Sequence, residues 1–146
     1  MIKRYKVNIS KRSINQINNK VINYPWTDIE KNSNWNMGTN LNYLKNLSKY
    51  WTTKFNWNYY QNKINKFSNY KTNIDGINIH FIKEKGSGSK PKPLLLMHGW
   101  PGSIIEFIDI IEKLAHPERF GGKKEDAFDL IIPSLPGFGF SGQLKK

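Results

Sequence analysis

A short turn in the last third of the chain has the residue types that can stabilise negative charge on a substrate oxygen. The apolar run at 94–97 stops at the sequence His-Gly-Trp-Pro-Gly-Ser, residues 98–103. Gly99 permits a tight bend and Pro101 fixes its own φ, so the backbone N–H of Trp100 can point into a site. A backbone N–H placed in this way is a typical oxyanion-hole donor. A plain strand-to-helix turn with a core Trp fits the same residues, so both interpretations stay open.

A second glycine-rich turn follows at 133–142, with the sequence Pro-Ser-Leu-Pro-Gly-Phe-Gly-Phe-Ser-Gly. Its glycines match the dinucleotide-binding pattern G-x-G-x-x-G, but two prolines separate them from the preceding strand and no helix opens there. Ser141 resembles a nucleophile elbow, G-x-S-x-G, yet Gln143 replaces the last glycine. We therefore interpret this turn as a site wall beside Trp100. The residues expected to shape the site are His98, Gly99, Pro101, Gly137 and Gly139.

Both turns require a strand–helix–strand unit to position them. The continuous apolar run at 94–97 predicts a strand buried on both faces. Ser103 and Glu106 fit a capping box, and one helix face then carries Ile104, Ile108, Ile111 and Leu114. The residues 116–126 read as a charged loop, and 128–132 as the second strand. This order predicts a right-handed βαβ unit with parallel strands.

The residues before this unit predict helices and then a hairpin. Helices are expected at 11–22 with Ser10 as N-cap, after Thr39 as N-cap, and at 57–67. Asp75-Gly76 predicts a hairpin turn between strands at 70–74 and 77–81, and the Gly- and Ser-rich stretch 85–91 predicts a flexible surface loop. The expected fold class is α/β: a helical region at 1–68, followed at 69–146 by the first strands of an α/β core.

Two further groups of residues have both a functional and a structural interpretation. His80 lies in a predicted strand, where a structural histidine is favoured over a catalytic one. The aromatic residues between 50 and 60 could stack on nucleic-acid bases, but their spacing favours the core of a helix pair.

Composition and charge exclude several classes of site. The chain has no cysteine, so disulfides, thiolate nucleophiles and Cys-based metal sites are absent, and its three histidines lack the spacing of helical ligand pairs. We expect no metal and no cofactor. The net charge of +12 permits nucleic-acid binding, but the lysines are scattered and arginine, the preferred phosphate and base reader, is scarce. We expect neither a nucleic-acid partner nor a membrane anchor, and a cytoplasmic location.

Taken together, the motifs resemble the N-terminal part of the microsomal-type epoxide hydrolases, which include the juvenile-hormone epoxide hydrolases. The resemblance covers about residues 5–143 and rests on short matches in order. They are Tyr-Pro-Trp at 24–26, Trp-Asn-Met-Gly-Thr at 35–39, Tyr-Trp at 50–51, Phe-Asn-Trp at 55–57, Ile-Asp-Gly at 74–76, Ile-His-Phe at 79–81, the run 94–103, and 128–141. The chain departs from the family at Tyr24, Asn56 and Asn58, where the family has charged residues.

The resemblance implies an α/β-hydrolase fold, an oxyanion-hole N–H at Trp100 and a Trp100–Pro101 bond that is often cis. It implies opening of a small apolar epoxide by an Asp nucleophile, followed by hydrolysis of the resulting ester by His-activated water. The family's nucleophile, lid tyrosines, acid and catalytic His all match positions beyond Lys146. We therefore expect this chain to be inactive alone and to need a C-terminal catalytic half, for example from a second chain. A non-catalytic protein-binding module is the alternative, and a nucleic-acid binder is the third. An open apolar sheet edge is expected to cause self-association.

Overall fold

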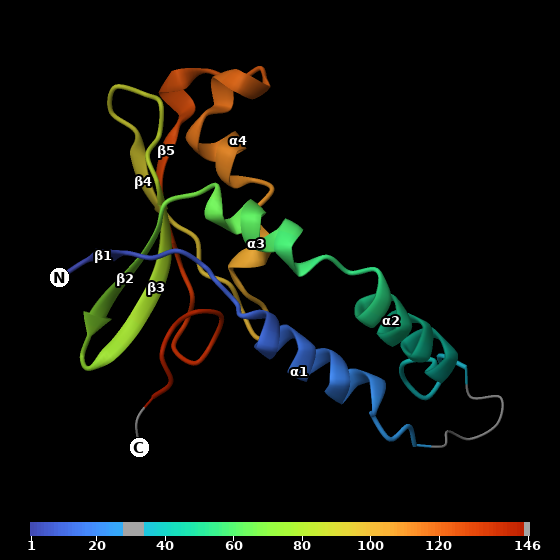
Figure 1. Ribbon diagram of the computed structural model, residues 1–146. Coiled ribbons are helices and arrows are strands. Elements are labelled where there is room, and N and C mark those ends of the chain that lie inside the picture. The colour runs from blue at the N-terminus through green and yellow to red at the C-terminus, as the bar shows by residue number, and fades with distance from the viewer. Residues whose placement is uncertain (28–33, 145–146) are drawn as a thin grey trace. The chain divides into compact units, whose positions relative to one another are not determined.

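A computed structural model describes residues 1–27 and 34–144, and these form two compact units (Figure 1). One unit comprises Asn8–Asn58, and the other comprises Met1–Val7 together with Tyr59–Lys146. The expected division at residue 68 stays a prediction.

The smaller unit is built from two amphipathic helices that contact each other. Helix α1, Lys11–Ile22, has the predicted N-cap Ser10, whose hydroxyl accepts a hydrogen bond from Ser13 N at 3.1 Å. Helix α2, Leu41–Thr53, begins one residue later than predicted. Its N-cap is Asn40 rather than Thr39, because the Asn40 side-chain oxygen accepts from Tyr43 N at 3.0 Å. Part of the 25–38 loop that precedes it lies outside the described residues.

The larger unit contains a five-stranded sheet in the order β1-β2-β3-β5-β4. Its strands are β1 (Lys3–Arg4), β2 (Asn69–Ile74), β3 (Ile77–Glu84), β4 (Lys92–Leu95) and β5 (Phe128–Pro133). Asp75 and Gly76 have φ values of 49° and 82°, which confirms the predicted hairpin turn. Strands β4 and β5 pair in parallel, and the other neighbours are antiparallel. The parallel pair confirms the predicted strand–helix–strand unit.

The connection between β4 and β5 is not the single helix that periodicity predicted. It begins as a 3-10 turn, η1 (Ile104–Phe107), and continues after a break as α4 (Ile111–Ala115). The Ser103 capping box is present as predicted. Ile104, Ile108 and Ile111 are all buried, because the broken helix keeps its apolar face on the sheet. Two further 3-10 turns, η2 (Pro117–Phe120) and η3 (Lys124–Asp126), lie within the predicted loop.

Helix α3, Trp57–Asn65, ends two residues earlier than predicted. Its Ile64 is buried, and the Asn65 side chain bonds the backbone N and O of Val7 at 2.9 and 2.8 Å. Lys63 forms an ion pair with Asp109 in the β4–β5 connection. These contacts attach α3 to the sheet unit.

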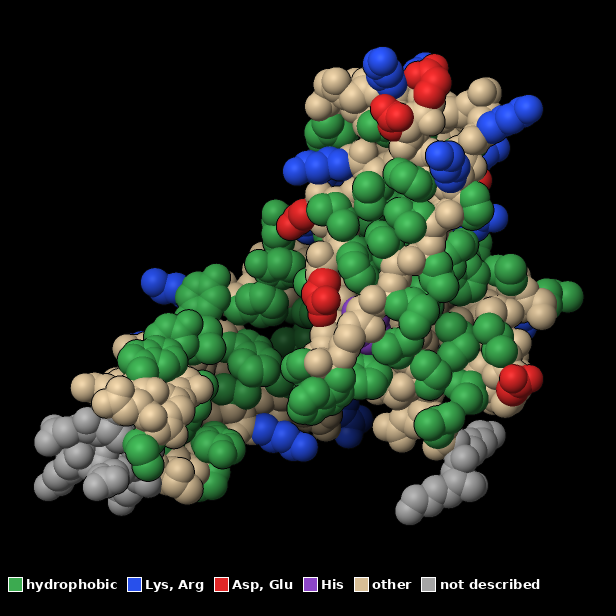
Figure 2. Space-filling view, turned by 180° about the vertical axis from the view of Figure 1, so that it is seen from behind, with side chains coloured by type: hydrophobic (Ala, Val, Ile, Leu, Met, Phe, Trp, Pro, Cys, Tyr) green, Lys and Arg blue, Asp and Glu red, His purple; other side chains and the backbone are tan. Residues whose placement is uncertain are grey.

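The prediction that the 94–97 run is buried on both faces is wrong for this chain. Among the described residues, β4 is the last strand of the sheet and has a neighbour on one side only, and Leu95 and Met97 are each 57% exposed. Figure 2 shows that hydrophobic side chains cover much of one face of the protein. The expected open apolar edge is therefore present.

The predicted aromatic core of a helix pair is also wrong. Tyr50 and Trp51 of α2 are about half exposed, and no residue of α1 or α2 is buried. The other exposed aromatic side chains of this span are Phe55, Tyr59 and Tyr60. Periodicity identified the apolar face correctly, but two short helices cannot cover each other. In the described part of the chain, no helix is long and apolar enough to cross a bilayer.

Candidate functional site

The candidate oxyanion turn, residues 98–103, is closed by its own backbone. Gly102 N donates to Gly99 O at 2.8 Å, and the intervening Trp100–Pro101 bond is cis. Ser103 N donates to the Glu106 carboxylate at 3.1 Å. A Cβ on Gly102 would lie 1.6 Å from that carboxylate oxygen, so only glycine allows the capping box to form unchanged. The turn and the start of η1 are thus one connected piece.

Trp100 is not the core residue that the structural interpretation would require. Its side chain is 84% exposed. Within residues 1–27 and 34–144, its backbone N–H donates to no acceptor. An N–H in a fixed turn with no internal partner is available to an oxygen atom of a bound group.

His98 joins this turn to the loop at 133–142. Its ring is nearly buried, with Nε2 3.1 Å from Leu135 N and Nδ1 3.0 Å from Gly99 O. A backbone N–H can only donate and a carbonyl can only accept, so Nε2 is the acceptor and Nδ1 carries the proton. Phe138 packs its ring against the imidazole at a centroid distance of 5.5 Å. His98 therefore holds the turn in the neutral form of its ring.

The loop at 133–142 is itself rigidly bonded. Gly137 and Gly139 have φ values of 83° and 53°, where glycine is favoured. Gly142 N donates to Asn78 O at 2.7 Å, and Gly142 O accepts from Gly137 N at 2.8 Å. The Ser141 hydroxyl donates to Ser134 O at 2.7 Å and accepts from His80 N at 2.9 Å. The Ser141 side chain thus has a structural role in this chain.

His80 is fully buried and hydrogen-bonded on both ring nitrogens, which confirms its structural interpretation. Nε2 lies 3.0 Å from Asn69 Oδ1, and Nδ1 lies 2.9 Å from Ser134 Oγ. Burial, helped by the charge of Lys71, lowers the pKa of His80 from 6.5 to about 4. Sequence reasoning missed Asn69 and Ser134 as its partners, because residues 11 and 54 positions away leave no local signal.

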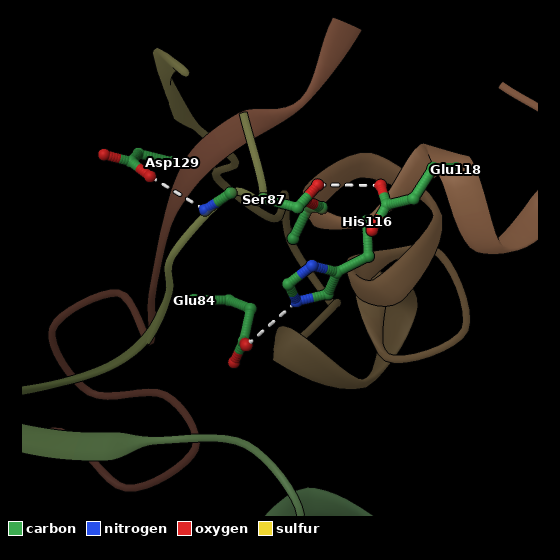
Figure 3. Close-up of polar contacts among 7 residues, drawn as sticks. Glu84, Ser87, His116, Glu118 and Asp129 are labelled. Atoms are coloured by element: carbon green, nitrogen blue, oxygen red, sulfur yellow. Dashed lines mark hydrogen bonds and ion pairs between the residues drawn. The ribbon is translucent and has the colours of Figure 1, made fainter. Parts of the chain in front are cut away.

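A second polar cluster lies at the opposite end of the sheet, where β3 ends and β5 begins (Figure 3). Ser87 Oγ donates to Glu118 at 2.7 Å, Gly86 N donates to Asp129 at 2.8 Å, and His116 contacts Glu84 at 3.5 Å. The hydrogen bond from Ser87 lowers the pKa of Glu118. Among the described residues, no three His, Asp or Glu side chains gather as metal ligands.

These contacts correct the prediction of a flexible loop at 85–91. Gly86 is buried, and a Cβ there would lie 2.7 Å from Pro91 Cβ and 2.8 Å from Phe128 O. These hydrogen bonds hold the 85–91 loop against the sheet, and we assign the cluster a structural role.

Comparison with known proteins gives consistent matches to one family. The family model for the epoxide hydrolase N terminus matches residues 2–107. Epoxide hydrolase 1 of Oryctolagus cuniculus is 40% identical over 144 residues, which cover 96% of this chain and 32% of that protein. Juvenile hormone epoxide hydrolase 1 of Ctenocephalides felis is 38% identical over 143 residues, 96% of this chain and 30% of that protein.

Solved structures agree. The juvenile hormone epoxide hydrolase of the silkworm Bombyx mori superposes with a TM-score of 0.85 at 32% identity, covering 100% of this chain and 35% of that one. The Aspergillus niger epoxide hydrolase gives a TM-score of 0.85 at 26% identity, with 99% and 38% coverage. The chain spans about a third of the length of these relatives. The family model matches most of the chain, and the sheet is mixed. The chain therefore belongs to the epoxide hydrolase N-terminus family, in the α/β-hydrolase fold.

Proposed function

We propose that this chain forms the N-terminal part of an epoxide hydrolase and supplies the oxyanion-hole donor, the backbone N–H of Trp100. One observation carries the proposal: this N–H has no partner in the described residues, yet it lies in a turn held by His98 and by the Ser103–Glu106 capping box. The expected reaction adds water to a small apolar epoxide through an alkyl-enzyme ester.

The second half of that reaction explains why a fixed N–H is useful. When water attacks the alkyl-enzyme ester, the carbonyl oxygen of the ester becomes negatively charged. A preorganised donor stabilises this charge without having to reorient. The nucleophile, the catalytic His and its acid would come from the C-terminal part of the protein, within the same polypeptide or from a second chain. No metal or cofactor is required by this chemistry.

The open side of β4 supports completion by such a C-terminal part. Strand β4 leads directly into the oxyanion turn and has a neighbour on one side only. Leu95 and Met97 are exposed there. An added strand would bond the free backbone of β4, cover these side chains and place its own end beside Trp100.

A hybrid enzyme tests the proposal. Residues 1–146 replace the matching segment of the silkworm enzyme, and the hybrid is assayed with an epoxide substrate of that enzyme. Replacing Trp100 by its α-hydroxy acid analogue turns one amide into an ester and removes only the N–H. Loss of an oxyanion-hole donor is expected to lower kcat by about 10²-fold to 10³-fold.

The control is the same replacement at Gly102, which removes the hydrogen bond from Gly102 N to Gly99 O but leaves the Trp100 N–H in place. It is expected to lower kcat far less. Equal losses at both positions would refute the assignment of Trp100, and an inactive parent hybrid would count against the enzymatic proposal as a whole.

The second candidate function is a non-catalytic module that binds another protein. The exposed aromatic side chains of α2, among them Tyr43, Tyr50 and Trp51, favour it. A chain that remains a stable monomer by itself, with no activity in the hybrid, would support this alternative.

A further inference from the structure

A path of buried and part-buried polar contacts runs from Asn69 to the candidate oxyanion turn, entirely within the sheet unit. It begins at Asn69, whose side-chain nitrogen donates to Ile64 O at 3.0 Å and to Phe67 O at 2.9 Å. Because that nitrogen is occupied by two carbonyls, the other amide atom, Oδ1, is an acceptor.

The orientation of Asn69 determines the proton positions on His80. Asn69 Oδ1 lies 3.0 Å from His80 Nε2, so Nε2 carries the proton and donates it. His80 Nδ1 is then the acceptor of the contact with Ser134 Oγ at 2.9 Å, and the Ser134 hydroxyl is the donor. All three side chains are buried, with exposed fractions of 0% for His80 and Ser134 and 3% for Asn69. Each polar atom in this group has one defined role.

Ser134 is linked to the oxyanion turn through the next residue, Leu135. Ser134 N also donates to His80 O at 2.9 Å, so both the backbone and the side chain of Ser134 are held by His80. The following N–H, on Leu135, donates to His98 Nε2, and His98 Nδ1 donates to Gly99 O in the turn. Any displacement of Ser134 therefore moves the partner of His98.

We propose that His80 is a positioning residue for the oxyanion hole, acting through Ser134, Leu135 and His98 on the turn that carries the Trp100 N–H. This inference rests on the proposed function. The two histidines hold opposite tautomers, His80 protonated on Nε2 and His98 on Nδ1, and each is required by its neighbours. Both rings are buried, so we assign them a positioning role.

Ser134→Ala in the silkworm hybrid removes the hydroxyl donor and leaves His80 Nδ1 without a partner. Because a misplacement of about 1 Å costs up to about 10²-fold in rate, we expect kcat to fall by about tenfold or more, with KM changed less than about twofold. Asn65→Ala is the matched control. It also removes part-buried hydrogen bonds, those between the Asn65 side chain and the Val7 backbone, but it does not contact Asn69, His80 or Ser134 through them.

Two substitutions of His80 separate positioning from stability. His80→Asn places its side-chain oxygen near the position of Nδ1 and keeps an acceptor for Ser134. In His80→Gln the longer side chain places its amide near the position of Nε2, beside Asn69, and the acceptor for Ser134 is lost. We expect the Asn variant to retain more kcat than the Gln variant, whichever of the two melts at the higher temperature.

A spectroscopic readout decides the inference without activity. With ¹⁵N-labelled histidine, the parent hybrid should show His98 as the Nδ1–H tautomer, and Ser134→Ala should shift it towards a mixture, while Asn65→Ala should not. If Ser134→Ala changes neither the His98 tautomer nor kcat more than Asn65→Ala does, the inference is overturned. If the parent hybrid is inactive but the tautomer still shifts, the proposed function fails and the positioning path stands.

Discussion

Burial of a neutral histidine makes the stability of the sheet unit depend on pH. His80 has no exposed surface, and its burial together with the charge of Lys71 lowers its pKa from 6.5 to about 4. In the unfolded chain the ring takes up a proton as the pH falls below 6.5, whereas in the folded chain it stays neutral until about pH 4. The unfolded state therefore binds more protons over this interval, and folding stability decreases as the pH falls.

The magnitude follows from the two pKa values. Between pH 7 and pH 5 the unfolded state gains about 0.7 of a proton at His80 and the folded state gains little, so integration over this interval gives a fall of about 2 kcal/mol in the free energy of unfolding. Below pH 4 the loss reaches its limit of about 3 kcal/mol. At pH above 6.5 the contribution is fully present.

Urea unfolding at pH 7 and pH 5 measures this change, and His80→Asn provides the reference. Subtracting the variant's pH dependence removes whatever the rest of the chain contributes. The wild type should lose about 2 kcal/mol more than the variant. A ¹⁵N titration should show His80 neutral down to about pH 4. Parallel pH profiles for the two proteins, or a ring that titrates near 6.5, would refute the reasoning.

Three further changes test the packing around the site. Gly139→Ala should lower the free energy of unfolding by about 1–3 kcal/mol, since the φ of Gly139 is 53° and a Cβ would lie 2.7 Å from Ser134 Oγ. Gly137 also has a positive φ but open space around it, so Gly137→Ala should lower the free energy of unfolding less. Urea unfolding compares the two variants, and equal losses would contradict this reasoning. Leu95→Lys should reduce self-association of the isolated chain in analytical ultracentrifugation, because a charge on an open edge opposes strand pairing; unchanged association would mean that β4 is not the contact. Ile111→Ala should cost about 2–5 kcal/mol, since the side chain is fully buried, and a loss under 1 kcal/mol would show that the helix face is not packed.

Local chemistry in the sequence was sufficient for several elements. Ser10 and the Ser103–Glu106 pair have side-chain oxygens that accept from backbone N–H groups two or three residues away, so their caps could be recognised. Asp75-Gly76 adopts the positive φ values that a two-residue hairpin turn needs. The same locality explains the small error at α2, where Thr39 and Asn40 are both suitable caps and only the structure distinguishes them.

Burial could not be predicted in the same way. An apolar run such as 94–97 reads as a central strand whether or not a neighbour is present, and only the strand order shows that β4 has one free side. The aromatic face of α2 was recognised as apolar, but whether it is covered depends on what lies opposite.

The residues that hold the candidate site were likewise decided by tertiary structure. Sequence pattern alone indicated the turn that carries Trp100 and the glycines at 137 and 139, because glycine and proline constrain the backbone locally. The pattern could not pair His80 with Ser134, or His98 with Leu135, since these contacts join segments 54 and 37 residues apart. Hydrogen bonds within a turn are encoded by neighbouring residues, whereas those that fix one turn against another arise only when the sheet brings distant strands together.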